Sequence, residues 1–101
     1  MQILEVGVAG TMESSDIMVR IEPKDTEGIE LTLESSVGQQ YGPQIRRVIL
    51  ETLRSLGVTK AKVDAVDKGA LDCAIEARVS VAAFRAARRD DYQWKTKGAE
   101  A

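Results

Sequence analysis

The chain has 101 residues, of which 44% are hydrophobic and 30% charged, with a formal net charge of −2, so it is expected to form one small domain with a modest core. It contains no histidine, which excludes Ser-His-Asp and Cys-His triads, imidazole acid–base catalysis and His-containing metal sites. The single cysteine, Cys73, excludes an intrachain disulfide and a cysteine-rich zinc site, and we expect neither a metal nor catalytic residues.

Two runs of alternating hydrophobicity in the first third of the chain predict β-strands. Residues 16–22 and 29–34 each alternate apolar with polar side chains, and a period of two is typical of a strand with one buried face. The connector at residues 23–28 is rich in turn-forming residues. We therefore expect these strands to pair as a β-hairpin. Residues 3–9 are a weaker strand candidate, because they contain two glycines.

Apolar residues at helical spacing between positions 37 and 56 predict a helix after this hairpin. Pro43 lacks a backbone N–H and clashes with the preceding turn of a helix. A short first turn is therefore expected before a main helix over residues 43–56. Gly57 is expected to cap the carboxyl end of this helix.

The last third alternates again, over residues 61–65 and 71–79, with a glycine-containing turn between the two runs. This pattern predicts a second hairpin whose last strand ends near Arg78, followed by a helix over residues 79–88. A helix over 71–79 is the competing interpretation, because apolar residues there also recur every four positions. In the strand interpretation, Cys73 is a small core residue.

The resulting order β-β-α-β-β-α predicts an α+β fold: one antiparallel sheet of two hairpins with helices packed on one face. Residues 1–90 would form this single domain. Residues 91–101 would form a polar, mobile tail.

The segment best suited to carry chemistry is the polar, glycine-containing loop at residues 9–16, which runs directly into a predicted strand. It holds Ser14 and Ser15, and an exposed hydroxyl on such a loop suits covalent modification. Both serines are also ordinary turn residues. Neither is expected to be a hydrolase nucleophile, because no histidine can deprotonate it and no lysine is near in sequence.

Residues 9–21, with the sequence AGTMESSDIMVRI, resemble the N-terminal motif of the citrate lyase acyl carrier protein family, the gamma subunit of that complex. The resemblance returns at residues 66–73, VDKGALDC, and covers roughly residues 1–90. Two separated motifs in register make it specific.

The resemblance implies a non-catalytic carrier subunit with 2′-(5″-phosphoribosyl)-3′-dephospho-CoA attached covalently to a serine through a phosphodiester. The matching position is Ser14, and Ser15 is the alternative. The thiol of this group would carry acetyl and citryl thioesters during cleavage of citrate to acetate and oxaloacetate. The implied partners are the acyl transferase and citryl lyase subunits and a prosthetic-group transferase.

Charge adds candidate docking residues. Residues 1–36 carry eight of the 16 acidic residues but only two of the 14 basic ones, which predicts either a solvated surface or an acidic face that steers a basic partner. Glu13 and Asp16 are docking candidates on this ground. Arg20 is another, as a partner for the phosphate of the group, although a cross-strand ion pair is the simpler role. Because basic residues do not dominate, no nucleic-acid partner is expected.

No apolar run approaches the roughly 18–20 residues of a membrane span. The first ten residues lack the basic region of a secretory signal. Together with a free cysteine, this predicts a cytoplasmic protein without a membrane partner. Two other functions remain open from sequence: the carrier subunit of malonate decarboxylase, and an unmodified α+β domain that binds a protein or ligand.

Overall fold

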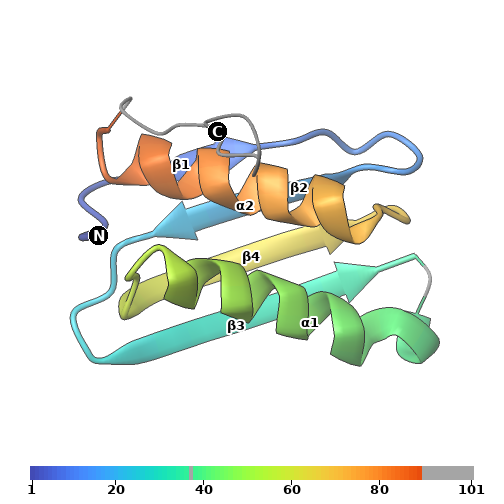
Figure 1. The fold of residues 1–101 in the computed structure, drawn as a ribbon, viewed down its shortest axis with the longest axis horizontal. Coiled ribbons are helices and arrows are strands. Elements are labelled where there is room, and N and C mark those ends of the chain that lie inside the picture. The colour runs from blue at the N-terminus through green and yellow to red at the C-terminus, as the bar shows by residue number, and fades with distance from the viewer. Residues whose placement is uncertain (37, 90–101) are drawn as a thin grey trace, which may run out of the picture.

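A computed structural model describes residues 1–36 and 38–89. The elements are, in order, β1 (Gly7–Ala9), β2 (Ile17–Glu22), β3 (Gly28–Ser35), α1 (Gly38–Ser55), β4 (Lys60–Asp67) and α2 (Asp72–Ala86). The strands form one sheet in the order β1-β2-β4-β3, and both helices lie across the same face of it (Figure 1). This arrangement confirms the α+β class with helices on one face. The predicted order β-β-α-β-β-α and the purely antiparallel sheet are wrong, because the order is β-β-β-α-β-α and the sheet is mixed. The predicted tail, residues 91–101, lies outside the described residues.

The first predicted hairpin is wrong. β2 and β3 are consecutive, but β4 lies between them, antiparallel to β2 and parallel to β3. The parallel pair is possible because α1 connects β3 to β4 as a crossover. Hydrophobic alternation defines which face of a strand is buried but not which strand lies beside it. The weaker strand candidate at residues 3–9 contains β1, which is antiparallel to β2.

The second predicted hairpin is also wrong, because residues 72–79 belong to α2. Ile75 and Val79 are fully buried, whereas Leu71 is 73% exposed and Cys73 is exposed. The four-residue spacing of these two buried side chains matches one face of a helix. The segment is therefore helical, despite its alternation with a period of two. Cys73 consequently lies on the outside of the first turn of α2 and is not the core residue predicted from a strand.

Helix α1 extends further than predicted, since it begins at Gly38 and includes Pro43. Pro43 is exposed and lies in the second turn, so the backbone donor that it lacks is lost near the amino end of the helix and not in its middle. The carboxyl end agrees with the prediction. Gly57 has φ +78°, and Val58 N donates to Leu53 O at 3.0 Å, which closes the helix.

The core lies between the sheet and the two helices. The inward positions of β2 and β4 are buried and alternate with more exposed, mostly polar positions on the opposite, open face of the sheet. Fully buried aliphatic side chains on these strands and helices include Ile17, Ile21, Val63, Ile49, Leu53, Ile75 and Val79. At one end of the molecule β2 begins, β3 and β4 end, and both helices begin (right side of Figure 1). The loop at residues 10–16, which contains Ser14 and Ser15 and which we call the serine loop, lies at this end.

Candidate functional site

The serine loop connects β1 to β2 and contains a tight turn. Asp16 N donates to Glu13 O at 3.2 Å, so Ser14 and Ser15 occupy the two central positions. Ser15 has φ 67°, in the left-handed region where a type II turn places its third residue. Both serines are exposed, and neither hydroxyl has a hydrogen-bond partner within the part of the chain that the structure describes. The turn thus presents two free hydroxyls to solvent.

The entry to the loop depends on Gly10. Its φ is +99°, and a Cβ atom at this position would lie 1.8 Å from the carbonyl oxygen of Ile17. The chain therefore needs a residue without a side chain here, both for its backbone conformation and for its approach to the start of β2.

Backbone hydrogen bonds attach the far side of the loop to the end of β4. Ser15 N donates to Lys68 O at 2.8 Å, and Lys68 N donates to Asp16 O at 2.8 Å. These two bonds continue the β2–β4 pairing beyond the strands and hold the Ser15 backbone in place.

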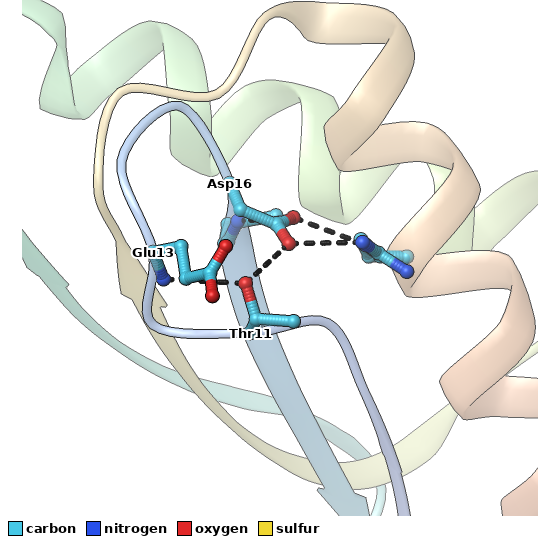
Figure 2. Close-up of polar contacts among 5 residues, drawn as sticks. Thr11, Glu13 and Asp16 are labelled. Carbon is cyan, nitrogen blue, oxygen red and sulfur yellow. Dashed lines mark hydrogen bonds and ion pairs between the residues drawn. The ribbon is translucent and has the colours of Figure 1, made fainter.

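The carboxylate of Asp16 is the centre of the side-chain contacts in the loop (Figure 2). Thr11 Oγ1 donates to its Oδ2 at 2.6 Å, and Ile17 N donates to its Oδ1 at 2.7 Å. Arg78 of α2 donates through Nε to Oδ1 at 3.0 Å and through Nη2 to Oδ2 at 2.9 Å. Glu13 N in turn donates to Thr11 Oγ1 at 3.2 Å. The loop is thereby tied both to itself and to α2.

These contacts shift the pKa values of both Asp16 and Arg78. The hydrogen bonds from Arg78 and Thr11 hold the pKa of the Asp16 carboxyl well below its usual range, against a smaller opposing effect of burial. The same ion pair raises the pKa of Arg78 above its ordinary value. Asp16 is thus a carboxylate engaged in an intramolecular bidentate pair.

A groove separates the loop from α2, with a volume of about 540 Å³. We call it the Ser14 groove. Its loop side consists of Glu13, Ser14, Ser15 and Asp16, and its helix side consists of Ala74, Ala77, Arg78 and Val81. Its volume falls in the range of roughly 300–1,000 Å³ that is typical of small-molecule sites.

A second aspartate stabilises the neighbouring turn between β4 and α2. Asp67 is fully buried. Its carboxylate accepts hydrogen bonds of 3.0 Å from Ser35 Oγ, Gly69 N and Ala70 N. The turn at residues 67–69, which the sequence placed inside a hairpin, instead leads from a strand into a helix.

Four of the predicted site residues, Glu13, Ser14, Ser15 and Asp16, lie together along the groove. Arg20 does not line the groove. It is on the open face of the sheet, 3.2 Å from Glu22 and 3.7 Å from Asp64 of the adjacent strand, which agrees with the simpler ion-pair role. No contact tests the docking roles predicted for Glu13, Asp16 and Arg20, and these remain predictions.

The sequence did not indicate the helix side of the groove. Arg78 is 62 positions from Asp16, and no local motif connects them. Its identification would have required α2 to be recognised as a helix first, since the strand interpretation gave Arg78 different neighbours.

Two further observations concern metal ligands and membrane spans among the described residues. Residues 1–36 and 38–89 contain no group of three or more His, Cys, Asp or Glu side chains arranged to hold a metal ion. Over the same residues, neither helix is long and apolar enough to cross a membrane.

Comparison with known proteins shows the family of this chain. A family model described as "Malonate decarboxylase delta subunit (MdcD)" matches residues 5–86. The citrate lyase acyl carrier protein of Streptococcus mutans serotype c is 58% identical over 95 residues, covering 94% of this chain and 93% of that protein. The protein of the same name from Streptococcus pyogenes serotype M5 is 54% identical with the same coverage. This chain belongs to the citrate lyase acyl carrier protein family.

Membership in this acyl carrier family supports a carrier role for the chain. The match includes the serine loop, the turn after β4 and the whole of α2. Among solved structures, homoserine kinase from Cytophaga hutchinsonii aligns with a TM-score of 0.54 and 14% identity, over 94% of this chain and 38% of the kinase. At this identity the likeness is one of fold alone.

Proposed function

We propose that this protein is the acyl carrier subunit of a citrate lyase complex and that its prosthetic group is attached to Ser14. The observation that carries the proposal is an exposed, unbonded serine hydroxyl at the centre of a firmly held turn, in a chain 54–58% identical to citrate lyase acyl carrier proteins. The attached group would be 2′-(5″-phosphoribosyl)-3′-dephospho-CoA, joined through a phosphodiester.

The backbone favours Ser14 over Ser15 as the attachment position. Ser15 has a left-handed backbone, and its amide is bonded to the carbonyl of Lys68. A residue with this conformation serves the turn, and glycine would serve it equally well. Ser14 precedes it in the turn without either constraint. Modification at Ser14 would therefore fall on the serine whose backbone is not needed to hold the loop to β4.

The residues around Ser14 fit a long, partly anionic group. The hydroxyl is exposed, and the adjoining groove supplies open space, small apolar side chains and one cation, Arg78. When bound, the group supplies the thiol that carries acyl units as thioesters. The chain itself contributes the attachment point and the rigid loop that orients it. Neither role needs a general base, which is consistent with a chain that has no histidine.

In this proposal catalysis belongs to the partners. An acyl transferase subunit would exchange acetate for citrate on the group, and a citryl lyase subunit would release oxaloacetate and restore the acetyl carrier. Tethering raises the effective substrate concentration at both subunits to the order of millimolar. The complex would act in the cytoplasm. A prosthetic-group transferase would be the third partner.

The second candidate is the carrier subunit of malonate decarboxylase, and it has a specific observation in its favour. The family model that matches residues 5–86 bears that description. The two candidates share the serine and the type of group but differ in their catalytic partners. The citrate lyase assignment is preferred because the relatives at 54–58% identity carry that name.

Intact mass spectrometry tests the attachment. The chain is co-expressed with the prosthetic-group transferase, and the expected result is one added group on the wild type and on Ser15→Ala, and none on Ser14→Ala. Modification of Ser14→Ala but not of Ser15→Ala would move the site by one residue. Complete absence of the group from all three chains would support an unmodified binding domain instead.

Co-purification distinguishes the two carrier functions. The loaded chain is offered citrate lyase catalytic subunits and malonate decarboxylase catalytic subunits in parallel. Retention of the citrate lyase subunits is expected. Exclusive retention of the malonate decarboxylase subunits would overturn the assignment to citrate lyase.

A further inference from the structure

The two sides of the Ser14 groove differ in chemistry. The loop side is polar and carries the carboxylates of Glu13 and Asp16. The helix side has the small apolar side chains of Ala74, Ala77 and Val81, which are half-buried. Since alanine projects little beyond the backbone, this stretch of α2 forms a low apolar floor next to the serine hydroxyl.

Among the described residues that line the groove, Arg78 is the only cation. Its bonds to Asp16 use Nε and Nη2. A guanidinium group has five N–H donors, so the donors on Nη1 are left for another acceptor. The side chain is 41% exposed, whereas that of Asp16 is 15% exposed. An anion entering from solvent therefore meets Arg78 more readily than it meets the carboxylate behind it.

The proposed group has parts that match these surfaces in the correct order. Next to the serine comes a phosphodiester, then a ribose and then adenosine, whereas the diphosphate and the thiol arm are farther along. A phosphodiester is recognised by guanidinium donors. A purine ring packs favourably on apolar surface that would otherwise face water.

We propose that the Ser14 groove holds the nucleotide portion of the group, with Arg78 donating to the phosphodiester and the floor of Ala74, Ala77 and Val81 packing against the adenosine. This inference rests on the proposed modification of Ser14. Fixing the near part of the group to α2 gives the long arm a defined starting direction, while its thiol end stays free to reach the partners.

The experiment compares unmodified and modified protein by NMR spectroscopy, with the loading of Ser14 first established by intact mass. The protein is labelled with ¹³C and ¹⁵N and the group is left unlabelled. The expected result is a set of isotope-filtered nuclear Overhauser effects between adenine ring protons of the unlabelled group and the methyl protons of Ala77 and Val81. The amide signals of residues 74–81 should shift together with those of the loop.

Two matched variants sharpen the test. Ala77→Gln fills the floor of the groove and should abolish the contacts between adenine and the methyl groups of Val81. Ser80→Gln places the same side chain in the middle of α2, at a half-buried position that does not line the groove, and should leave those contacts intact. The amide spectrum of each unmodified variant shows whether it is folded. If Ala77→Gln does not fold, Val81→Gln replaces it, with loss of the adenine contacts to Ala77 as its readout.

The possible failures can be told apart. A fully loaded wild type that shifts only at residues 13–16 and has no adenine contacts would overturn the groove assignment and leave the proposed function standing. Absence of loading at Ser14 would overturn both. Equal loss of contacts in Ala77→Gln and Ser80→Gln would show that the helix surface as a whole, and not the groove, determines them.

Discussion

Asp16 and Asp67 each organise a loop at the same end of the molecule, but they do so with different partners. Asp67 is fully buried, and its described donors are all neutral, namely one hydroxyl and two backbone amides. Asp16 is partly exposed and accepts from Thr11 and, through a two-bond ion pair, from Arg78 of a distant helix. The loop leaves Ser14 and Ser15 exposed, and it is held by backbone hydrogen bonds to Lys68 and by a charged contact across the groove.

Substitution of one glycine in each loop, Gly10 or Gly69, is expected to give the largest difference in the free energy of unfolding. Gly10→Ala places a Cβ atom 1.8 Å from a backbone oxygen, whereas a Cβ atom at Gly69 meets nothing within 4 Å. Both have positive φ. We expect Gly10→Ala to lower the free energy of unfolding by about 4 kcal/mol, and Gly69→Ala by only about 1 kcal/mol from backbone strain. Urea denaturation measures both. Equal losses would show that the serine loop moves away from β2 at little cost.

The buried carboxylate is expected to contribute the next largest effect. Asp67→Ala leaves Ser35 Oγ, Gly69 N and Ala70 N without their acceptor, which should cost about 3 kcal/mol, because unsatisfied buried polar groups are penalised. Asp67→Asn retains one acceptor oxygen and should cost about half as much. Urea denaturation at neutral pH is the measurement. If both variants are as stable as the wild type, the contacts of Asp67 do not support the turn.

The partly exposed ion pair between Asp16 and Arg78 should contribute less to stability than Asp67 does, and its contribution should depend on pH. The pKa of Asp16 is lowered in the folded state, whereas an aspartate in an unfolded chain titrates near ~3.9. Its stabilising effect is therefore complete above about pH 5 and is lost as the pH falls through 4 toward the folded pKa. Because the pair is partly exposed, Asp16→Asn should cost about 1 kcal/mol at pH 7.

The stability difference between wild type and Asp16→Asn should accordingly shrink as the pH falls below about 5. Urea denaturation midpoints measured between pH 7 and pH 3 test this. Arg78→Lys is the control, since it keeps a cation but loses the planar two-bond contact with Asp16. A difference that stays constant with pH would contradict the lowered pKa of Asp16.

The smallest effect concerns the two adjacent serines. Ser15 is in the left-handed region, where glycine avoids about 1 kcal/mol of strain but loses part of that gain through its flexible unfolded state. Ser15→Gly should therefore raise the free energy of unfolding by about 0.5 kcal/mol. Ser14 has no positive φ, and Ser14→Gly should bring no gain. Thermal denaturation compares the pair. Stabilisation by Ser14→Gly would mean that the turn is strained at the other serine.

The layers of the fold could be predicted from the sequence, but which strands lie side by side could not. Alternation located β2, β3 and β4, because β2 and β4 bury one face under the helices and β3 half-buries one. It could not show that β4 is inserted between the other two, since the same alternation satisfies either order. Within residues 71–79 both periods were present, and only the burial of Ile75 and Val79 against exposed Leu71 and Cys73 separates them.

The candidate site also has one part that could be predicted from the sequence and one part that could not. The serines and both adjacent acids are consecutive in the chain, so a motif could find them. Arg78 and the alanines of α2 reach the serine loop only through tertiary structure. A strand assignment for that segment removed them from consideration. Long-range partners of this kind leave no local signal in a single sequence.

The order in which these partners are synthesised has a consequence of its own. Ser14 is made early, but its loop is held by the backbone of Lys68 and by Arg78, which lies 62 residues after Asp16. A chain emerging from the ribosome cannot complete the loop until most of α2 has been made, even though the serine has long been accessible. If Ser14 is modified as proposed, a transferase that recognises the finished turn would load completed carriers and pass over unfinished ones, and the modification would then depend on correct folding.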